Sequence, residues 1–455
     1  MNVSRRDILK SAFTSALAAV CLPAGLVQKV KAESGKKVVL RFAATSDLHF
    51  SSEDAPDAPQ RVRLAKAIQT MNLYAPRQEY PAFDALLAVG DLSDHGYAEE
   101  LADFRAILDR EMKPETARVL CVGNHELYKG SQLLFEETFS TKANRHIVLN
   151  GYHFIVIAPE TGNCEEGDYL YIRDWFAEEL KKASEATPDR PIFVVQHYNV
   201  YNTTWGSADL PGDFPCGVKD LLGVIDRYPR VVHITGHTHA PTIHPRTIWQ
   251  GAFTSIGTGS LCDYSLFSEG VGSFRCPEGV DPKQAGTFLI FEVYDDQSIL
   301  IKLYDTISDS FLDREYLLTD PCNPEKFTYT DQRLNAAAPP VWPEGARLEA
   351  VNTSASETTI AIPAAQDESR VVYYTVTLEK CAPREEREEQ DEREEEQPRV
   401  YRFWSDFFMK NRSPRLYASV DGLTAETAYR AKVTATNAFK KDTTAALTVE
   451  FTTQK

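Results

Sequence analysis

The chain lacks a long apolar run and lacks excess positive charge. Beyond Val27, no segment approaches the roughly 18 consecutive apolar residues that a membrane-spanning helix needs, so we expect no transmembrane span. The 66 acidic residues outnumber the 49 lysines and arginines and leave a formal net charge of −17 at pH 7. A nucleic-acid polymer and an anionic membrane surface both favour a basic face, so we expect neither as the main partner.

Cysteine pairs with metal-ligand spacing are also missing. The eight cysteines include no Cys-x-x-Cys pair, which argues against a thiolate metal site. Cys121 lies in an apolar run and is expected to be a buried strand thiol. In an oxidising compartment six others could form disulfides, and their spacing leaves the pairing open: Cys164, Cys216, Cys262, Cys276, Cys322 and Cys381.

The first 32 residues have the form of an export signal. Ser4-Arg5-Arg6-Asp7 precedes a modest apolar stretch from about Ser11 to Val27, and Val30-Lys31-Ala32 is a candidate cleavage site. This pattern resembles a bacterial twin-arginine signal. We therefore expect residues 1–32 to be removed and the mature protein to be periplasmic or secreted.

The body of the chain alternates strand-like and helix-like segments. With 455 residues and 43% hydrophobic content, it is long enough for two or three domains with real cores. Short apolar runs alternate with amphipathic stretches, which is typical of an α/β fold. The predicted strands are 38–44, 86–89, 118–122, 153–158, 191–195 and 231–235, and the predicted helices are 59–73, 99–111 and 170–183.

Five of these predicted strands end at Asp, Asn or His residues. Since strands of an open α/β sheet direct their carboxyl ends into one crevice, we expect these side chains to meet. They are Asp47, His49, Asp91, Asn124, His125, His197, His237 and His239. Oxygen and imidazole ligands without thiolate suit Mn, Fe, Zn or Ni. Their number exceeds what one ordinary site holds and favours two metals that share a carboxylate.

The order of the motifs is more specific than any one of them. An isolated His-x-His is often a chance surface pair, but here five motifs follow one another: Asp47-x-His49, Gly90-Asp91-x-x-Asp94, Gly123-Asn124-His125-Glu126, a lone His197, and Gly236-His237-x-His239. This ordered set resembles the calcineurin-like metallophosphoesterase family over residues 36–335. The resemblance implies a four-layer α/β/β/α sandwich, with further strands expected at 254–258, 287–294 and 298–304.

The resemblance also implies a role for each motif residue. The first metal would be bound by Asp47, His49 and His239, the second by Asn124, His197 and His237, and Asp91 would bridge them. Two divalent or mixed-valence metal ions are thus the implied cofactors, sharing a hydroxide that attacks phosphorus. His125 is implied as the general acid and Asp94 as the carboxylate that orients it and keeps it protonated. A simple turn or cap carboxylate is the alternative for Asp94.

At two positions this chain differs from related phosphatases, which narrows the kind of phosphoesterase it resembles. Purple acid phosphatases place a metal-binding tyrosine where this chain has Asp94, so we expect no iron-tyrosinate centre. Phosphoprotein phosphatases carry arginine where His95 stands, which argues against a phosphoprotein substrate. The remaining histidines are expected to be structural or at the surface: His95, His146, His153, His233 and His244.

Aromatic residues follow several motif-bearing segments. They are Phe50, Tyr128, Tyr198, Tyr201, Trp205 and Tyr264. Their rings could stack on a base or a sugar, or they could pack the loops, and the sequence leaves both open.

A second domain is expected after the linker Ala336-Ala337-Ala338-Pro339-Pro340. Residues 341–455 contain only strand-like segments, and residues 422–437 resemble a fibronectin type III domain with its tyrosine corner. The tryptophan that such domains carry on strand B is absent, with Ile362 near that position. An acidic insertion at 384–397 is expected to be a solvated loop or exposed helix, with calcium binding as a lesser alternative.

The leading hypothesis is an exported dimetal phosphoesterase that hydrolyses small phosphomonoesters or phosphodiesters, nucleotides included. One alternative is an adhesin or polymer-binding protein with a secondary metal site, in which the C-terminal domain contacts a surface polymer. Another is a hydrolase of a pyrophosphate-linked or other ester.

Overall fold

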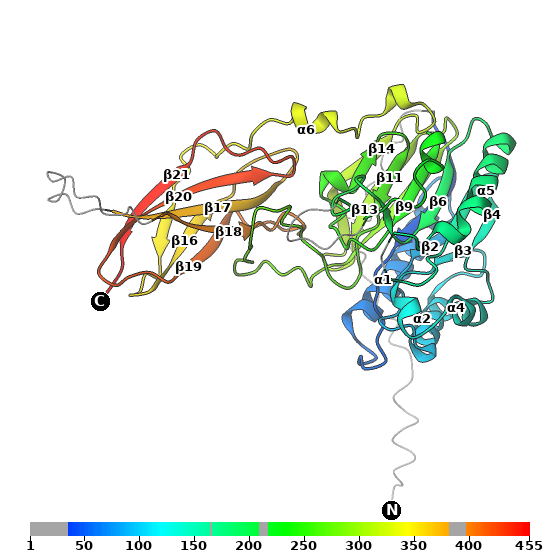
Figure 1. Cartoon of the computed structure of the whole chain (residues 1–455), viewed down its shortest axis with the longest axis horizontal. Helices are drawn as coiled ribbons and strands as arrows, with labels where there is room; N and C mark the ends of the chain where they lie inside the picture. The colour runs from blue at the N-terminus through cyan, green and yellow to red at the C-terminus, as the bar shows by residue number, and fades with distance from the viewer. Residues whose placement is uncertain (1–34, 164–165, 209–216, 382–396) are drawn as a thin grey trace, which may run out of the picture.

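A computed structural model describes residues 35–163, 166–208, 217–381 and 397–455. The predicted signal peptide, Cys164, Cys216 and nearly all of the acidic insertion lie outside these ranges. The described residues form an α/β body followed by a smaller all-β body (Figure 1). Within the described ranges, no helix is both long and apolar enough to cross a membrane.

The first sheet of the α/β body has six strands in the order β14-β13-β12-β1-β2-β3. Strands β1, β2 and β3 run parallel to one another, whereas β12 pairs with β1 antiparallel and begins an antiparallel edge. The strands are β1 Val38–Thr45, β2 Ala85–Val89, β3 Ala117–Cys121, β12 Thr287–Tyr294, β13 Ile299–Asp305 and β14 Ser310–Leu318.

The second sheet also has six strands, in the order β10-β11-β9-β6-β5-β4. Its inner strands β5, β6, β9 and β11 are parallel, and the hairpin partners β4 and β10 form the edges. The strands are β4 Arg145–Leu149, β5 Tyr152–Ile157, β6 Ile192–Gln196, β9 Val231–Thr235, β10 Ile248–Gln250 and β11 Thr254–Gly257.

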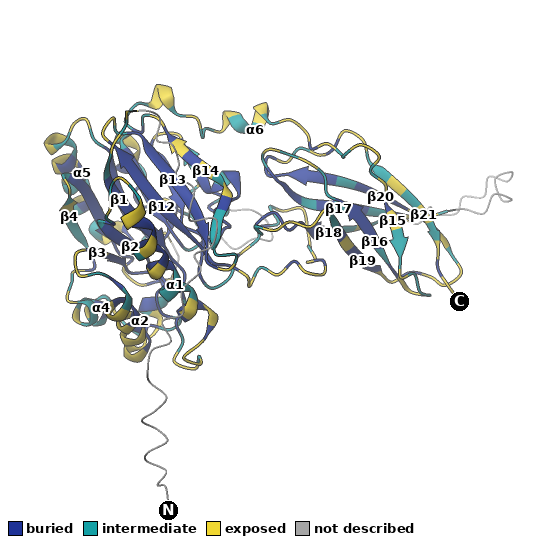
Figure 2. Cartoon of the chain, turned by 180° about the vertical axis from the view of Figure 1, so that it is seen from behind, coloured by how far each residue is buried: buried dark blue, intermediate teal, exposed yellow. Residues whose placement is uncertain are grey.

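The two sheets pack face to face and helices cover their outer faces. Alternation along β1 shows this: Phe42 contacts Phe154 and Phe193 of the other sheet, whereas Ala43 belongs to the core under the helices. Helices α1 Pro59–Tyr74 and α2 Ala98–Glu111 cover the first sheet, with α4 Gln132–Phe139 beside α2, and α5 Arg173–Ala186 covers the second. The predicted α/β class is confirmed, with buried strands enclosed by half-exposed helices (Figure 2).

Most predicted elements lie within two residues of their observed bounds. The helix expected from 170 begins instead with a single 3-10 turn at Leu170–Ile172, and α5 starts at Arg173. In the two six-stranded sheets, three edge strands, β4, β10 and β14, were not predicted.

The C-terminal body is a sandwich of two antiparallel sheets. One has the order β15-β16-β19 and the other β18-β17-β20-β21, and both face one apolar core. The strands are β15 Glu349–Val351, β16 Glu357–Pro363, β17 Val371–Lys380, β18 Arg399–Trp404, β19 Arg415–Asp421, β20 Ala428–Asn437 and β21 Leu447–Thr452. The short helix α6 Gln332–Ala336 precedes the predicted linker.

The described cysteines are free thiols. Cys121 is fully buried in β3 as predicted, and burial raises the pKa of its thiol to about 12. The sequence left open whether the other described cysteines pair, and the structure has Cys262, Cys276, Cys322 and Cys381 as free thiols.

Candidate metal centre

The predicted ligands meet where the carboxyl ends of β1, β2 and β3 face those of β6 and β9. Six of them form two groups, and within each group one ligand atom per residue lies within 4.8 Å of the others; a third such group joins His49 to Asp94 and His125. The first group is Asp47, His49, Asp91 and His239, and the second is Asp91, His197 and His237. Asp91 belongs to both groups, which is the arrangement expected of a carboxylate shared by two metals.

Asp91 lies at the centre of the cluster and is almost completely buried. Its Oδ2 is 3.0 Å from Nε2 of His197 and 3.9 Å from Nε2 of His49, so it faces both groups. Burial alone would raise the pKa of this carboxyl, but the surrounding imidazoles, His197 foremost, hold the pKa well below its usual range. Asp91 is therefore a carboxylate, the form that binds a cation.

Two histidines are oriented as metal ligands would be. Nδ1 of His197 donates to the carbonyl of Val89 at 2.7 Å, and Nδ1 of His239 donates to Asp263 at 3.1 Å. In each ring this bond occupies Nδ1 and leaves Nε2 as the nitrogen that faces the cluster. Nε2 of His239 lies 3.0 Å from Nε2 of His49 and 3.2 Å from Oδ1 of Asp47, as expected for atoms that converge on one cation.

Asn124 supplies a further oxygen. Its Nδ2 donates to the hydroxyl of Tyr128 at 2.7 Å, whereas its buried Oδ1 has no hydrogen-bond partner among the described residues. A buried carbonyl oxygen without a hydrogen-bond donor destabilises the fold unless an ion or a water molecule binds it. The position beside Asp91 and the donor chemistry fit a metal ion, so the residues present fit a dimetal centre.

The backbone is strained at the predicted ligands. Five of them have left-handed backbone: Asp47 (φ 53°), His49 (48°), Asp91 (50°), His237 (66°) and His239 (49°). Non-glycine residues seldom adopt this conformation, and such strain collects at functional sites. This feature is independent of the side-chain distances and marks the same residues.

Two glycines allow the strand ends to approach one another. A Cβ at Gly90 would lie 2.4 Å from Nδ1 of His197, and a Cβ at Gly123 would lie 2.2 Å from Oδ1 of Asp91. No side chain fits at either place. The glycines of the Gly-Asp and Gly-Asn-His-Glu motifs are thus required by packing around the ligands.

His125 lies at the rim of the cluster, with about a quarter of its side chain exposed. Its Nδ1 donates to the backbone carbonyl of Asp94 at 2.6 Å, and the Asp94 carboxylate stands 3.6 Å away. The main chain of Asp94 makes the short bond, and its carboxylate lies at ion-pair distance from the same nitrogen, so its role in orienting the imidazole stays a prediction. Burial lowers the pKa of His125, and the charges of Asp91 and Asp94 oppose that shift.

Three residues of this site escaped sequence reasoning. Glu126 is buried and accepts from the backbone N–H groups of Asp91, Ser93 and Gly123, which joins two motif loops. Burial, reinforced by the charge of Asp91, raises the pKa of Glu126 to about 6. Asp263 orients His239, and Tyr128 orients Asn124. Glu126 and Tyr128 lie beside predicted residues, but nothing in the sequence links Asp263 to His239.

The packing interpretation holds for most loop aromatics. Phe50, Tyr198, Trp205 and Tyr264 are buried. Tyr128 is 48% exposed, and its ring centroid lies 4.5 Å from that of His125. Of the histidines expected to be structural, His233 is buried between Ser255 and Gln196, and His244 stacks on Trp205 with centroids 3.9 Å apart.

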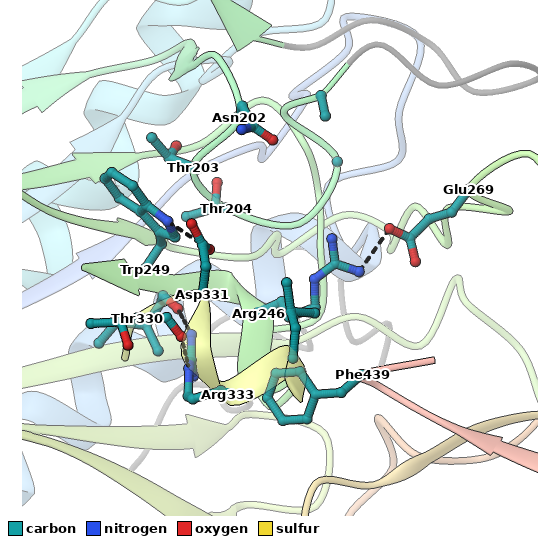
Figure 3. Close-up of a pocket in the computed structure, with 14 residues that line it drawn as sticks. Asn202, Thr203, Thr204, Arg246, Trp249, Glu269, Thr330, Asp331, Arg333 and Phe439 are labelled. Atoms are coloured by element: carbon teal, nitrogen blue, oxygen red, sulfur yellow. Dashed lines mark hydrogen bonds and ion pairs between the residues drawn. The ribbon is translucent and has the colours of Figure 1, made fainter. Parts of the chain in front are cut away.

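A separate cavity of about 270 Å³ lies near the junction of the two bodies (Figure 3). Its charged groups are already paired: Arg246 with Glu269 at 2.7 Å, and Asp331 with the indole N–H of Trp249 at 3.0 Å. None of the predicted metal ligands is among the described residues that line it. The cavity is therefore distinct from the metal centre.

The family comparison agrees with this geometry. Residues 40–241 match the family model described as calcineurin-like phosphoesterase, a range that contains all seven predicted metal ligands. The chain is a metal-dependent phosphoesterase.

The individual proteins that resemble this chain share little sequence identity with it. A 3',5'-cyclic-nucleotide phosphodiesterase of Nostoc sp. is 24% identical over 209 residues, which cover 45% of this chain and 73% of that protein. A UPF0046 protein of Caenorhabditis elegans is 24% identical over 176 residues, 35% of this chain and 57% of that protein. Among solved structures, a purple acid phosphatase from yellow lupin seeds has 14% identity and a TM-score of 0.42, over 61% of this chain and 53% of that one.

Proposed function

We propose that this protein is an exported dimetal phosphoesterase that hydrolyses phosphomonoesters or phosphodiesters of small molecules. The observation that carries the proposal is the sharing of Asp91 between two ligand groups. The first metal would be held by Asp47, His49, Asp91 and His239, and the second by Asp91, Asn124, His197 and His237. Bound there, two metals would lower the pKa of a nucleophilic water and stabilise charge on phosphate oxygens.

His125 is the residue proposed to protonate the leaving oxygen. Because its Nδ1 is occupied by the carbonyl of Asp94, Nε2 is the nitrogen free to exchange a proton with substrate. That nitrogen lies 4.0 Å from Oδ2 of Asp91, at the edge of the ligand cluster. A leaving group bound over the cluster would thus meet His125 on one side.

Nucleotides, cyclic nucleotides among them, are the first substrates to test. The relative from Nostoc is named for 3',5'-cyclic nucleotides, and that supports a diester substrate of this class. The exposed ring of Tyr128 next to His125 offers a flat apolar surface on which a base or sugar can stack.

The proposal is tested by loading the purified mature chain with Mn²⁺ and assaying p-nitrophenyl phosphate, bis-p-nitrophenyl phosphate and 3',5'-cyclic nucleotides. We expect hydrolysis of at least one, abolished by Asp91→Asn. Glu450→Gln, at an exposed carboxylate of β21 that pairs with Arg430, serves as the control and leaves turnover unchanged. Absence of turnover on every substrate, with metal content unaltered in Asp91→Asn, would refute a dimetal enzyme.

The C-terminal sandwich is proposed to be fibronectin type III-like. Its three-plus-four strand arrangement supports this, as does the hydroxyl of Tyr429, which accepts from the backbone N–H of Thr424 at 2.9 Å in the manner of a tyrosine corner. Export is proposed from the twin-arginine pattern at Ser4–Lys10. Fusion of residues 1–32 to a reporter that is active only after folded export tests it, and Arg5→Lys with Arg6→Lys should abolish the signal.

A further inference from the structure

The two bodies of the chain share one hydrophobic core. Phe407 and Phe408, which follow β18, are buried in the same apolar cluster as Trp205 and Tyr264 of the α/β body. The ring of Phe408 meets that of Tyr264 edge to face with centroids 5.6 Å apart. Beside them, Nζ of Lys410 donates to the carbonyl of Phe311 at 2.6 Å. The sandwich is thus anchored on the α/β body by buried aromatic rings as well as by surface polar contacts.

The segment that receives Phe408 also supports the metal centre. We call residues 260–267 the bridging loop. At its start, the hydroxyl of Ser260 donates to the backbone carbonyl of Asp47 at 2.9 Å. Next, Asp263 accepts from Nδ1 of His239, and the N–H of Ser265 donates to the carbonyl of His239 at 3.2 Å. The bridging loop therefore holds two predicted ligands of the first metal, Asp47 and His239.

The other contacts of the bridging loop are apolar and reach the sandwich. Tyr264, one residue after Asp263, is buried between Phe408 and Thr287, to which its hydroxyl bonds at 2.5 Å. Phe267 packs edge to face on Trp205, with centroids 5.3 Å apart, and Trp205 in turn contacts Phe407. One short segment thus touches the first metal site on one side and the C-terminal sandwich on the other.

We propose that the C-terminal sandwich sets the metal affinity of the first site through the bridging loop, with Phe408 as a positioning residue. This proposal rests on the dimetal centre proposed above. Groups that orient a metal-binding histidine contribute about 10- to 100-fold to metal affinity, and Asp263 holds that place for His239. Removal of the Phe408 ring leaves Tyr264 without its packing partner, which loosens the loop that carries Asp263.

The test is a Mn²⁺ titration of the full chain by calorimetry, with metal content measured by elemental analysis. Phe408→Ala should weaken one of two binding sites about tenfold and leave the other at its original affinity. Val376→Ala is the matched control, since Val376 is fully buried in the sandwich's own core and outside the shared cluster. It should lower the melting temperature while both metal affinities stay unchanged.

Two results would overturn the proposal: two unaltered affinities in Phe408→Ala, or an equal loss of affinity in Val376→Ala, which would make the effect one of general stability. If Phe408→Ala does not fold, Phe408→Leu takes its place, because leucine keeps an apolar side chain in the shared core. The same comparison with Val376→Ala then applies, with a smaller expected loss of metal affinity. A parent protein that binds fewer than two metals would instead refute the dimetal centre, so the two failures are distinguishable.

Discussion

Left-handed backbone occurs in both bodies of this chain, in contrasting settings. In the C-terminal sandwich it occurs mostly at exposed turn residues between strands, Asn352, Glu426 and Lys440, and once at the buried Arg370, which is paired with Asp313. The α/β body also has such turns, but there left-handed backbone occurs in addition at Asp47 and Asp91, which are buried carboxylates at strand ends. Turn strain of the first kind serves only to reverse the chain. Strain in a buried carboxylate persists only where the surrounding structure holds it in place for a purpose.

The difference extends to polar groups. Each side chain of the sandwich core is apolar or, like Tyr429, has its polar atom bonded within the fold. At the strand ends of the α/β body, carboxylates and imidazoles crowd together, and the oxygen of Asn124 lacks a hydrogen-bond partner among the described residues. The core of the sandwich therefore obeys the rules of folding, whereas the cluster breaks them where chemistry is proposed.

Substitution of Asp91 is expected to have the largest effect on turnover. Asp91→Asn removes the negative charge that both ligand groups share, so turnover should fall below detection in the phosphodiester assay. The variant also loses the ion pair of Asp91 with His197, so its melting temperature in the presence of chelator should fall while the chain stays folded. A variant that unfolds instead would assign Asp91 a structural role.

Loss of His125 should have the next largest effect. His125→Ala should reduce turnover of substrates with poor leaving groups by about 10² or more, since a general acid contributes on that order. Substrates that release p-nitrophenol need less protonation and should be affected less. Elemental analysis should still find both metals, and a loss of metal would mean that His125 is a ligand.

A smaller effect is expected at Tyr128. Tyr128→Phe removes the hydroxyl that holds the amide of Asn124, so affinity for one metal should fall about tenfold while KM changes little. Tyr128→Leu also removes the exposed ring and should raise KM for nucleotides beyond the effect of Tyr128→Phe. Tyr417→Phe, at an exposed tyrosine of β19, is the control. Equal KM values for the Phe and Leu variants would show that the ring does not contact substrate.

The smallest effect is expected from a substitution in the C-terminal sandwich, on stability alone. Tyr429→Phe deletes the hydrogen bond to Thr424 and should lower the free energy of unfolding by about 1 kcal/mol, measured by urea denaturation. Turnover and metal affinity should stay at their original values, because Tyr429 lies in the sandwich's own core. A change in either would mean that the whole sandwich, and not only Phe408, is coupled to the site.

The sequence predicts the buried strands and the ligands because both have local signals. Val231–Thr235 is a continuous apolar strand, and His237 and His239 follow it directly, so the position of each ligand is encoded next to the element that places it. The strands that escaped prediction are edges: β14 carries Asp313, Arg314 and Glu315 within its span, which obscures the alternation.

Residues that act across the fold had no such signal. Asp263 and Phe408 come from segments far apart in sequence, and their partners, His239 and Tyr264, are defined only by how the sheets and the two bodies pack. For Asp94 the spacing predicts proximity to His125, but it cannot distinguish the main-chain carbonyl from the carboxylate as the hydrogen-bond acceptor.

The central claim is that Asp91 is shared by two metal ions. It is tested most directly by elemental analysis of the Mn²⁺-loaded mature chain beside Asp91→Asn under the same conditions. We predict two metal ions per chain in the parent protein and fewer than two in the variant. One metal ion per chain in both proteins would contradict the account.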